Sequence, residues 1–190
     1  MPRSADKIVT YITEELHRKP SDVTTILLTH FHIDHTGSVA ELRQRTGAKV
    51  AAHTDDAAYI DGTTPTPPPK SLTLRMLSSF MRVRPCPIDI HLNDGETLAG
   101  TTVFHTPGHT PGSIAVLAAT PAALFCGDTI RSPKGNLEGP AEQYTMDYKE
   151  ALRSVEKIKQ LEFDVLLSGH GDPILPHASE KVRQHFSTQP

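Results

Sequence analysis

The sequence predicts an α+β protein whose mixed sheets carry helices on their outer faces. Helical and strand patterns alternate in the first part of the chain, strand patterns follow one another in the middle, and a helix–strand–helix pattern closes it. Early alternation favours parallel strands, whereas consecutive strands favour hairpins. Sequence pattern alone leaves both α+β and α/β layering open.

The first part of the chain contains two strands and three helical segments. Ser4 can cap a helix over residues 4–17 that Pro20 ends. Apolar side chains recur in it at helical spacing: Ile8, Tyr11, Ile12 and Leu16. The elements that follow are a strand at 26–28, a helix at 38–45, a strand at 48–53 and a helical turn at 55–60.

A proline-rich stretch separates these elements from the rest. Residues 63–69, TTPTPPP, exclude helix and central strand and predict a stiff surface loop. In the following residues 71–81, apolar side chains fall on one face of a short helix. Three interpretations stay open for this helix: a lid that recognises apolar substrates, a packing helix and a dimer contact.

The second part of the chain reads mostly as strand. The turn Asn93-Asp94-Gly95 introduces it. The predicted elements are strands at 101–105, 113–118 and 122–126, a helix at 147–160, a strand at 165–167 and a helix at 179–185.

Length and composition indicate one ordinary globular domain over residues 1–190. The 190 residues can bury a core that is stable without disulfides. A net charge of −3 without a basic stripe gives no reason to expect nucleic-acid binding. No apolar run approaches the roughly 18 residues that span a bilayer. The start of the chain shows no signal-peptide pattern, and Cys86 and Cys126 lack CxxC spacing, so we expect reduced thiols and a cytoplasmic protein.

The stretch THFHIDHTGS holds the chemistry that stands out most. It places His30, His32, Asp34 and His35 directly after an apolar strand. Three further turns also carry a ligand-type side chain: His109 in TPGHTPG, Asp128 in CGD and His170 in SGHG. Side chains placed by loops on a rigid scaffold are a common arrangement for binding sites.

These seven side chains are more than one metal ion takes. A zinc ion binds about four donors, and a catalytic zinc keeps one of them for water. Imidazole and carboxylate without thiolate suit zinc, iron, manganese or cobalt. The count therefore predicts two metal ions. If the loop is extended, His30, His32 and Asp34 point the same way, and a local turn permitted by Gly37 brings in His35.

The order HxHxDH, PGHTPGS, GDT and GHG resembles the metallo-β-lactamase-fold hydrolase superfamily over roughly residues 4–186. Within the superfamily, these motifs most resemble those of the glyoxalase II, lactonase and general metal-hydrolase branch. The resemblance implies an αββα sandwich with a dinuclear metal site. It places His30, His32 and His109 on one metal, and Asp34, His35 and His170 on the other. It makes Asp128 the bridge, and makes Asp34 and Asp128 the catalytic carboxylates.

The resemblance also implies a reaction. Two zinc ions about 3.5–4 Å apart supply a bridging hydroxide that attacks a carbonyl or phosphoryl centre. The expected enzyme is a hydrolase that cleaves a small ester, lactone, thioester or β-lactam. Two alternatives stay open: a mononuclear non-haem iron dioxygenase of the persulfide type, and a truncated metal-binding module without turnover. Metal content, oxygen uptake and hydrolysis separate the three.

The chain departs from the family pattern at its start and in its specificity features. Members usually begin with several strands before the first helix, whereas SADKI here resembles that helix. We expect strands of the first sheet to be missing and their place taken by a homodimer partner, by strand exchange or by rearranged packing; a clipped start is the alternative. We see no counterpart of the glutathione-binding domain of glyoxalase II after His170, which counts against glyoxalase II proper. Lactonases of this fold tend to carry a Tyr shortly after the bridging Asp, whereas Thr129-Ile130-Arg131 follows Asp128 here.

A few other polar residues have two interpretations each. His53 and His105 end predicted strands, where they either support a ligand or pack in the core. Arg131 either binds an anionic substrate group or is solvated. Cys126 fits a small buried apolar residue.

Overall fold

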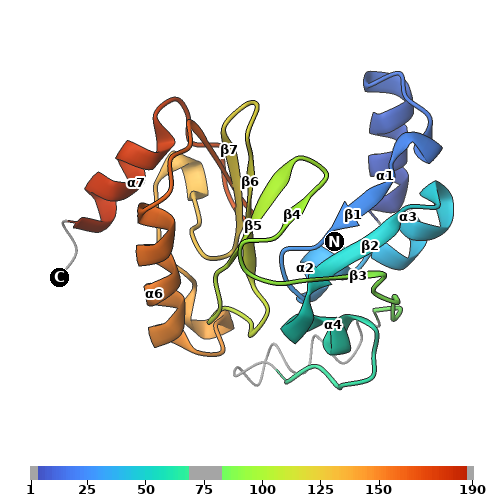
Figure 1. The fold of residues 1–190 in the computed structure, drawn as a ribbon, viewed down its shortest axis with the longest axis horizontal. Coiled ribbons are helices and arrows are strands. Elements are labelled where there is room, and N and C mark those ends of the chain that lie inside the picture. The colour runs from blue at the N-terminus through green and yellow to red at the C-terminus, as the bar shows by residue number, and fades with distance from the viewer. Residues whose placement is uncertain (1–3, 69–82, 188–190) are drawn as a thin grey trace. The chain divides into compact units, whose positions relative to one another are not determined.

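The computed structural model describes residues 4–68 and 83–187, so the helix predicted over residues 71–81 lies outside the described residues. The chain divides into two compact units, Met1–Leu92 and Asn93–Pro190. Each unit has its own sheet, as Figure 1 shows. One parallel sheet and one mixed sheet, each with helices, confirm the α+β prediction. The single domain, the homodimer and the missing first-sheet strands stay predictions.

The first unit is built on a parallel sheet with strand order β1-β2-β3. Its elements are α1 (Ala5–Thr10), the π-helix η1 (Tyr11–Glu15), the 3-10 helix η2 (Pro20–Asp22), β1 (Thr25–Leu27), α2 (Ile33–Thr36), α3 (Val39–Thr46), β2 (Lys49–His53), α4 (Thr54–Ile60) and β3 (Ile90–Leu92). Parallel neighbours need a crossover connection, which α2 and α3 provide between β1 and β2. Leu28, Phe31, Val50 and Ile60 belong to the core of this unit.

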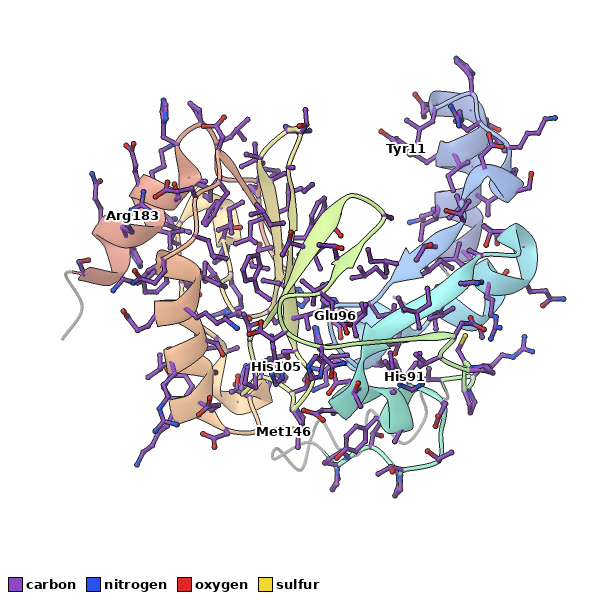
Figure 2. All side chains as sticks on the ribbon, in the orientation of Figure 1. Tyr11, His91, Glu96, His105, Met146 and Arg183 are labelled. Carbon is purple, nitrogen blue, oxygen red and sulfur yellow. The ribbon has the colours of Figure 1, made fainter. Side chains whose placement is uncertain are left out.

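The first helix is confirmed, but of the four apolar residues at helical spacing only Ile12 is half-buried. Ile8, Tyr11 and Leu16 are 39%, 57% and 52% exposed, and Figure 2 labels Tyr11 on this helix. Polar contacts hold the segment to α3 instead: the backbone N–H of Ser4 donates to Ser38 Oγ at 2.9 Å, and Arg45 pairs with Asp6 at 2.6 Å.

The loop after β1 is held by a buried carboxylate. Leu28 still donates its N–H to the Ala51 carbonyl, as part of the sheet, at 2.9 Å. Beyond it, the N–H of Phe31 donates to Asp56 Oδ2 at 2.8 Å, and Asp56 is fully buried in the first turn of α4. The path of the histidine-rich loop is thus tied to the helix that follows β2.

The second unit is built on a sheet with order β4-β5-β6-β7-β8. Its elements are β4 (Thr97–Leu98), β5 (Thr101–His105), β6 (Ile114–Ala118), β7 (Ala123–Gly127), the 3-10 helices η3 (Pro133–Gly135) and η4 (Glu142–Tyr144), α6 (Tyr148–Lys159), β8 (Val165–Ser168) and α7 (Ala178–Ser187). Strands β4 to β7 pair antiparallel and β8 pairs parallel with β7. The helix α6 lies in the crossover between β7 and β8, as parallel pairing requires.

Helices α6 and α7 cover one face of this sheet (Figure 1). Leu124 and Leu166 from the sheet pack with Ile158 and Val182 from the helices, and all four are fully buried. The carboxylate of Asp147 caps α6 by accepting from the N–H of Glu150 at 3.0 Å. An N-cap of this kind satisfies a backbone donor that the helix leaves without a partner.

The start of α6 also contacts the loop between β5 and β6. Gly108 has φ of +118°, and a Cβ built there would lie 2.1 Å from the backbone nitrogen of Ala151. The hydroxyl of Ser154 donates to the Pro107 carbonyl at 2.7 Å. Only glycine permits this close approach, which explains the Pro-Gly pair that precedes His109.

Among the helices that the structure describes, none combines the length and the apolar character needed to cross a membrane.

Replacing Asp56 with Ala is expected to destabilise the protein by about 1–3 kcal/mol, because the buried N–H of Phe31 loses its acceptor. Chemical denaturation in the presence of a chelator measures the effect without contributions from metal. The control Asp56→Asn keeps an acceptor oxygen and should cost less. Equal losses for the two variants would show that the hydrogen bond to Phe31 does not matter.

Replacing Gly108 with Ala should cost clearly more stability than replacing Gly100. Both glycines have positive φ, but a Cβ at Gly100 meets nothing within 4 Å. Gly100→Ala therefore reports only the backbone strain of about 1–2 kcal/mol, whereas Gly108→Ala adds overpacking of about 1–3 kcal/mol. The difference between the two denaturation free energies measures the contact with α6. A difference near zero would contradict the close approach.

Candidate metal centre

The first unit gathers the four ligand-type side chains of the THFHIDHTGS stretch. The rings of His30 and His32 have centroids 4.9 Å apart, and those of His30 and His35 are 4.0 Å apart. Nε2 of His35 lies 3.6 Å from Asp34 Oδ2. His30 is buried, whereas the other three are half-buried. The loop therefore concentrates three imidazoles and one carboxylate at the carboxyl end of β1.

A helical turn, rather than an extended loop, presents the last two of these residues. His32 is extended and forms the N-cap of α2, which contains both Asp34 and His35. The alternation predicted for His30, His32 and Asp34 thus ends at His32. The turn is closed by Thr36, whose hydroxyl donates to the carbonyls of Phe31 and His32.

Thr29 contacts two of the imidazoles at once. Its hydroxyl oxygen lies 3.2 Å from Nδ1 of His30 and 3.3 Å from Nδ1 of His35. Both contacts are on the Nδ1 side of the ring. Thr29 thus orients both rings, and Nε2 of each ring lies on the side away from the Thr29 hydroxyl.

The second unit brings His109, Asp128 and His170 together because of its topology. Asp128 and His170 follow the parallel strands β7 and β8, whose carboxyl ends lie at one edge of the sheet. His109 precedes β6, which runs antiparallel to β7 and therefore begins at that same edge. The N–H of Gly169 donates to the Gly127 carbonyl at 2.8 Å, which extends the pairing up to the ligand-type residues.

One carboxylate oxygen of this group faces two imidazoles. Oδ2 of Asp128 lies 3.5 Å from Nε2 of His109 and 3.2 Å from Nε2 of His170. His109 and Asp128 are buried, while the side chain of His170 is 44% exposed. The three side chains, which come from three separate turns, converge on Asp128.

His109 is held from both ends of its loop. Its Nδ1 lies 3.2 Å from the hydroxyl of Thr145, and its carbonyl accepts from the N–H of Met146 at 3.2 Å. His105, at the end of β5, has its Nε2 2.8 Å from the Pro111 carbonyl. Since a carbonyl only accepts, His105 donates this bond and supports the loop that carries His109.

Asp128 and His170 are also fixed by their neighbours. Thr129 donates its hydroxyl to that of Thr106 at 3.3 Å, which ties the turn after β7 to the end of β5. The N–H of Ser132 donates to the His170 carbonyl at 3.0 Å. Gly171 follows with φ of +129°, and a Cβ there would lie 2.2 Å from the Ser132 carbonyl. The segment after Asp128 thus packs directly on the turn that carries His170.

Three other residues singled out by the sequence have structural roles. His53 caps α4, because its Nδ1 accepts from the N–H of Asp55 at 3.2 Å. Arg131 pairs with Glu138 at 2.7 Å and donates to the Gly139 carbonyl. Burial raises the pKa of Cys126 to about 12, so its thiol stays neutral and the prediction of a small buried residue holds.

Apart from His105, the sequence patterns did not reveal the residues that support the ligands. Asp56 reads as an ordinary acidic residue at the start of a helix, and Thr145 lies in a loop without a motif. Thr29 could have been noticed, because it directly precedes His30. Their roles depend on contacts with residues that are distant in sequence or on the local turn.

The donor atoms in both units fit a metal of intermediate hardness. Each unit offers imidazole nitrogen together with carboxylate oxygen, and neither set includes a thiolate. Such a set suits zinc, iron, manganese or cobalt.

Comparison with curated proteins finds metallo-hydrolases. The probable metallo-hydrolase YflN of Bacillus subtilis (strain 168) is 30% identical over 92% of this chain and 74% of its own length. The probable metallo-hydrolase YybB of the same organism is 28% identical over 79% of the chain and 65% of its length. A hydroxyacylglutathione hydrolase of Cereibacter sphaeroides is 35% identical over 78% of the chain. The chain spans about half, 48%, of that last relative.

Solved structures agree on the fold. The di-iron-bound form of TTHA1623 matches with a TM-score of 0.70 and 27% identity, over 90% of this chain and 79% of that one. The BLEG-1 B3 metallo-beta-lactamase matches with a TM-score of 0.68 and 29% identity, over 97% and 85%.

The model of one protein family matches residues 6–170, a stretch that includes all seven ligand-type side chains. Its match agrees with the relatives and with the solved structures. The chain belongs to the metallo-beta-lactamase superfamily.

Proposed function

We propose that this protein is a metal-dependent hydrolase that uses two zinc ions to cleave a small ester, lactone, thioester or β-lactam. The family and its metallo-hydrolase relatives support hydrolysis that depends on a metal. The two-ion arrangement is our inference from the number of donor atoms, and the kind of substrate is our inference from the names of the relatives.

The observation that carries the proposal is the position of Asp128. Its Oδ2 faces Nε2 of both His109 and His170, at 3.5 and 3.2 Å. A carboxylate flanked by two imidazoles suits a residue that contacts two cations at once.

The ligand sets that we propose are those that the family resemblance implies. We assign His30, His32 and His109 to one ion, and Asp34, His35 and His170 to the other, with Asp128 shared. Each ion then has three protein donors of its own and shares the carboxylate of Asp128, and water could bind as a further ligand. The half-buried Asp34 is the carboxylate that would hold a proton next to the reacting group.

When bound, such ions lower the pKa of coordinated water and polarise a carbonyl. The chain's own contribution is orientation: Thr29, Asp56 and Thr145 hold the rings and the loop in place. Fixed ligands reduce the reorganisation that the site must undergo during the reaction.

The names of the relatives guide the choice of substrates. Hydroxyacylglutathione hydrolases are among the sequence relatives, and a B3 metallo-beta-lactamase is among the structural ones. The first name gives an acylated glutathione as the compound hydrolysed, and the second gives a β-lactam. A thioester and a β-lactam therefore belong in the substrate panel, beside simple esters and lactones.

Metal quantification coupled to hydrolysis assays tests the proposal directly. We expect two equivalents of zinc per chain and turnover of at least one substrate in the panel. A single iron with oxygen uptake would instead establish the oxygenase alternative. Full metal content without turnover on any substrate would support a binding module and contradict the proposal.

Replacing Asp128 with Asn should reduce bound metal and turnover together, because the amide cannot supply the charge that two cations share. Loss of a supporting partner of a ligand costs about 10–100-fold in affinity, so the loss of the shared ligand should exceed about 100-fold. Competition with a chelator measures the affinity.

The matched control is Asp172→Asn, an exposed aspartate two residues after His170. It makes the same chemical change and should keep both metal and activity. An Asp128→Asn variant with unchanged zinc affinity would rule out the shared ligand.

A further inference from the structure

The segment just before α6 contacts the His109 turn through three groups. The N–H of Met146 donates to the His109 carbonyl at 3.2 Å, and the N–H of Asp147 donates to the Gly108 carbonyl at 2.9 Å. Thr145 lies in sequence between η4 and Met146, and its hydroxyl oxygen is 3.2 Å from Nδ1 of His109. Figure 2 labels Met146 in this segment and His105 at the end of β5, the strand that precedes the His109 turn. Thr145 is 1% exposed, so this contact is sheltered from water.

The direction of the hydrogen bond between Thr145 and His109 can be worked out. The Thr145 hydroxyl also lies 2.8 Å from the Ala141 carbonyl, which can only accept. The single hydroxyl proton therefore points to Ala141. What Thr145 offers to His109 is a lone pair, so Nδ1 of His109 must carry the proton and donate it.

This direction determines the state of the other ring nitrogen. A neutral imidazole has one proton, so a proton on Nδ1 leaves a lone pair on Nε2. Nε2 is the atom that faces Asp128 Oδ2 at 3.5 Å. A lone pair beside a carboxylate oxygen is an arrangement that a cation stabilises, because both atoms can then coordinate it.

We propose that Thr145 is a positioning residue that holds His109 in the tautomer protonated on Nδ1, so that Nε2 is ready to bind a metal ion. This inference rests on the proposed function, since it takes His109 as a metal ligand. Without Thr145, a proton on Nε2 could donate to Asp128, and metal binding would have to displace it. Thr145 therefore keeps the proton off Nε2, so that metal binding does not have to displace it.

Two substitutions separate the hydroxyl from the shape of the side chain. Thr145→Val keeps the branched shape and loses both hydrogen bonds, whereas Thr145→Ser keeps the hydroxyl and loses a methyl group. Circular dichroism and thermal unfolding check that each variant is folded. The serine variant is the matched control, because a purely packing role would affect it as well.

The first measurement is the tautomer of His109 in metal-free protein, read from ¹⁵N chemical shifts of its ring at a pH where the ring is neutral. A His109→Gln spectrum assigns the signal. We expect the proton on Nδ1 in the wild type and in Thr145→Ser, and a shift towards Nε2 in Thr145→Val. A proton on Nε2 in the wild type would overturn the proposal.

The second measurement is zinc affinity by competition with a chelator. Residues that orient a ligand typically contribute about 10–100-fold, so we expect a loss of that size in Thr145→Val and less than about threefold in Thr145→Ser. Equal losses in the two variants, or no loss in either, would overturn the proposal.

These measurements do not depend on turnover, which separates the two proposals. A wild type that shows the expected tautomer and zinc affinity, but hydrolyses nothing, refutes the proposed function and leaves the role of Thr145 supported. An active hydrolase in which Thr145→Val behaves like the wild type in both measurements refutes only the role of Thr145.

Discussion

The parallel pairing of β7 with β8 is the constraint on which the second unit and its ligand-type residues depend. It requires a crossover, which α6 supplies, and it places the turns after both strands at one edge of the sheet. The same crossover brings the start of α6 against the His109 turn, where Gly108 permits backbone contact with Ala151. Together with the antiparallel pairing of β6 with β7, the parallel pairing accounts for the convergence on Asp128 and for the support that His109 receives.

The fold was predictable where the pattern is local. The helix expected at 147–160 is α6, Tyr148–Lys159, with Asp147 as its cap. The strand expected at 101–105 has the observed bounds, and the strand expected at 26–28 begins and ends one residue earlier. A local turn was expected at His35, but not that it is helical and includes Asp34, because the four residues of α2 are too few to show a helical pattern. The exposed side of α1 shows a further limit: apolar spacing indicates a helix, but tertiary contacts decide which face is buried.

For the candidate site, the sequence supplied the ligand-type residues and the structure supplied their supports. His30, His109, Asp128 and His170 all lie in short motifs after or before apolar strands, and residue type alone makes them conspicuous. Asp56 and Thr145 are ordinary residues whose contacts join segments far apart in the chain. No local pattern encodes such a contact, since it exists only once the strands have paired. The single-domain, dimer and missing-strand predictions concern arrangement rather than local pattern.

The spacing of the ligand-type residues also bears on how metal and folding are linked. His30 to His35 stay close neighbours even in a denatured chain, so that segment can chelate a cation without any native structure. His109, Asp128 and His170 become neighbours only through the native sheet. A cation that binds the denatured state as well stabilises the native state by less than its affinity suggests. Any gain in thermal stability on adding metal should therefore report mainly what the second unit contributes.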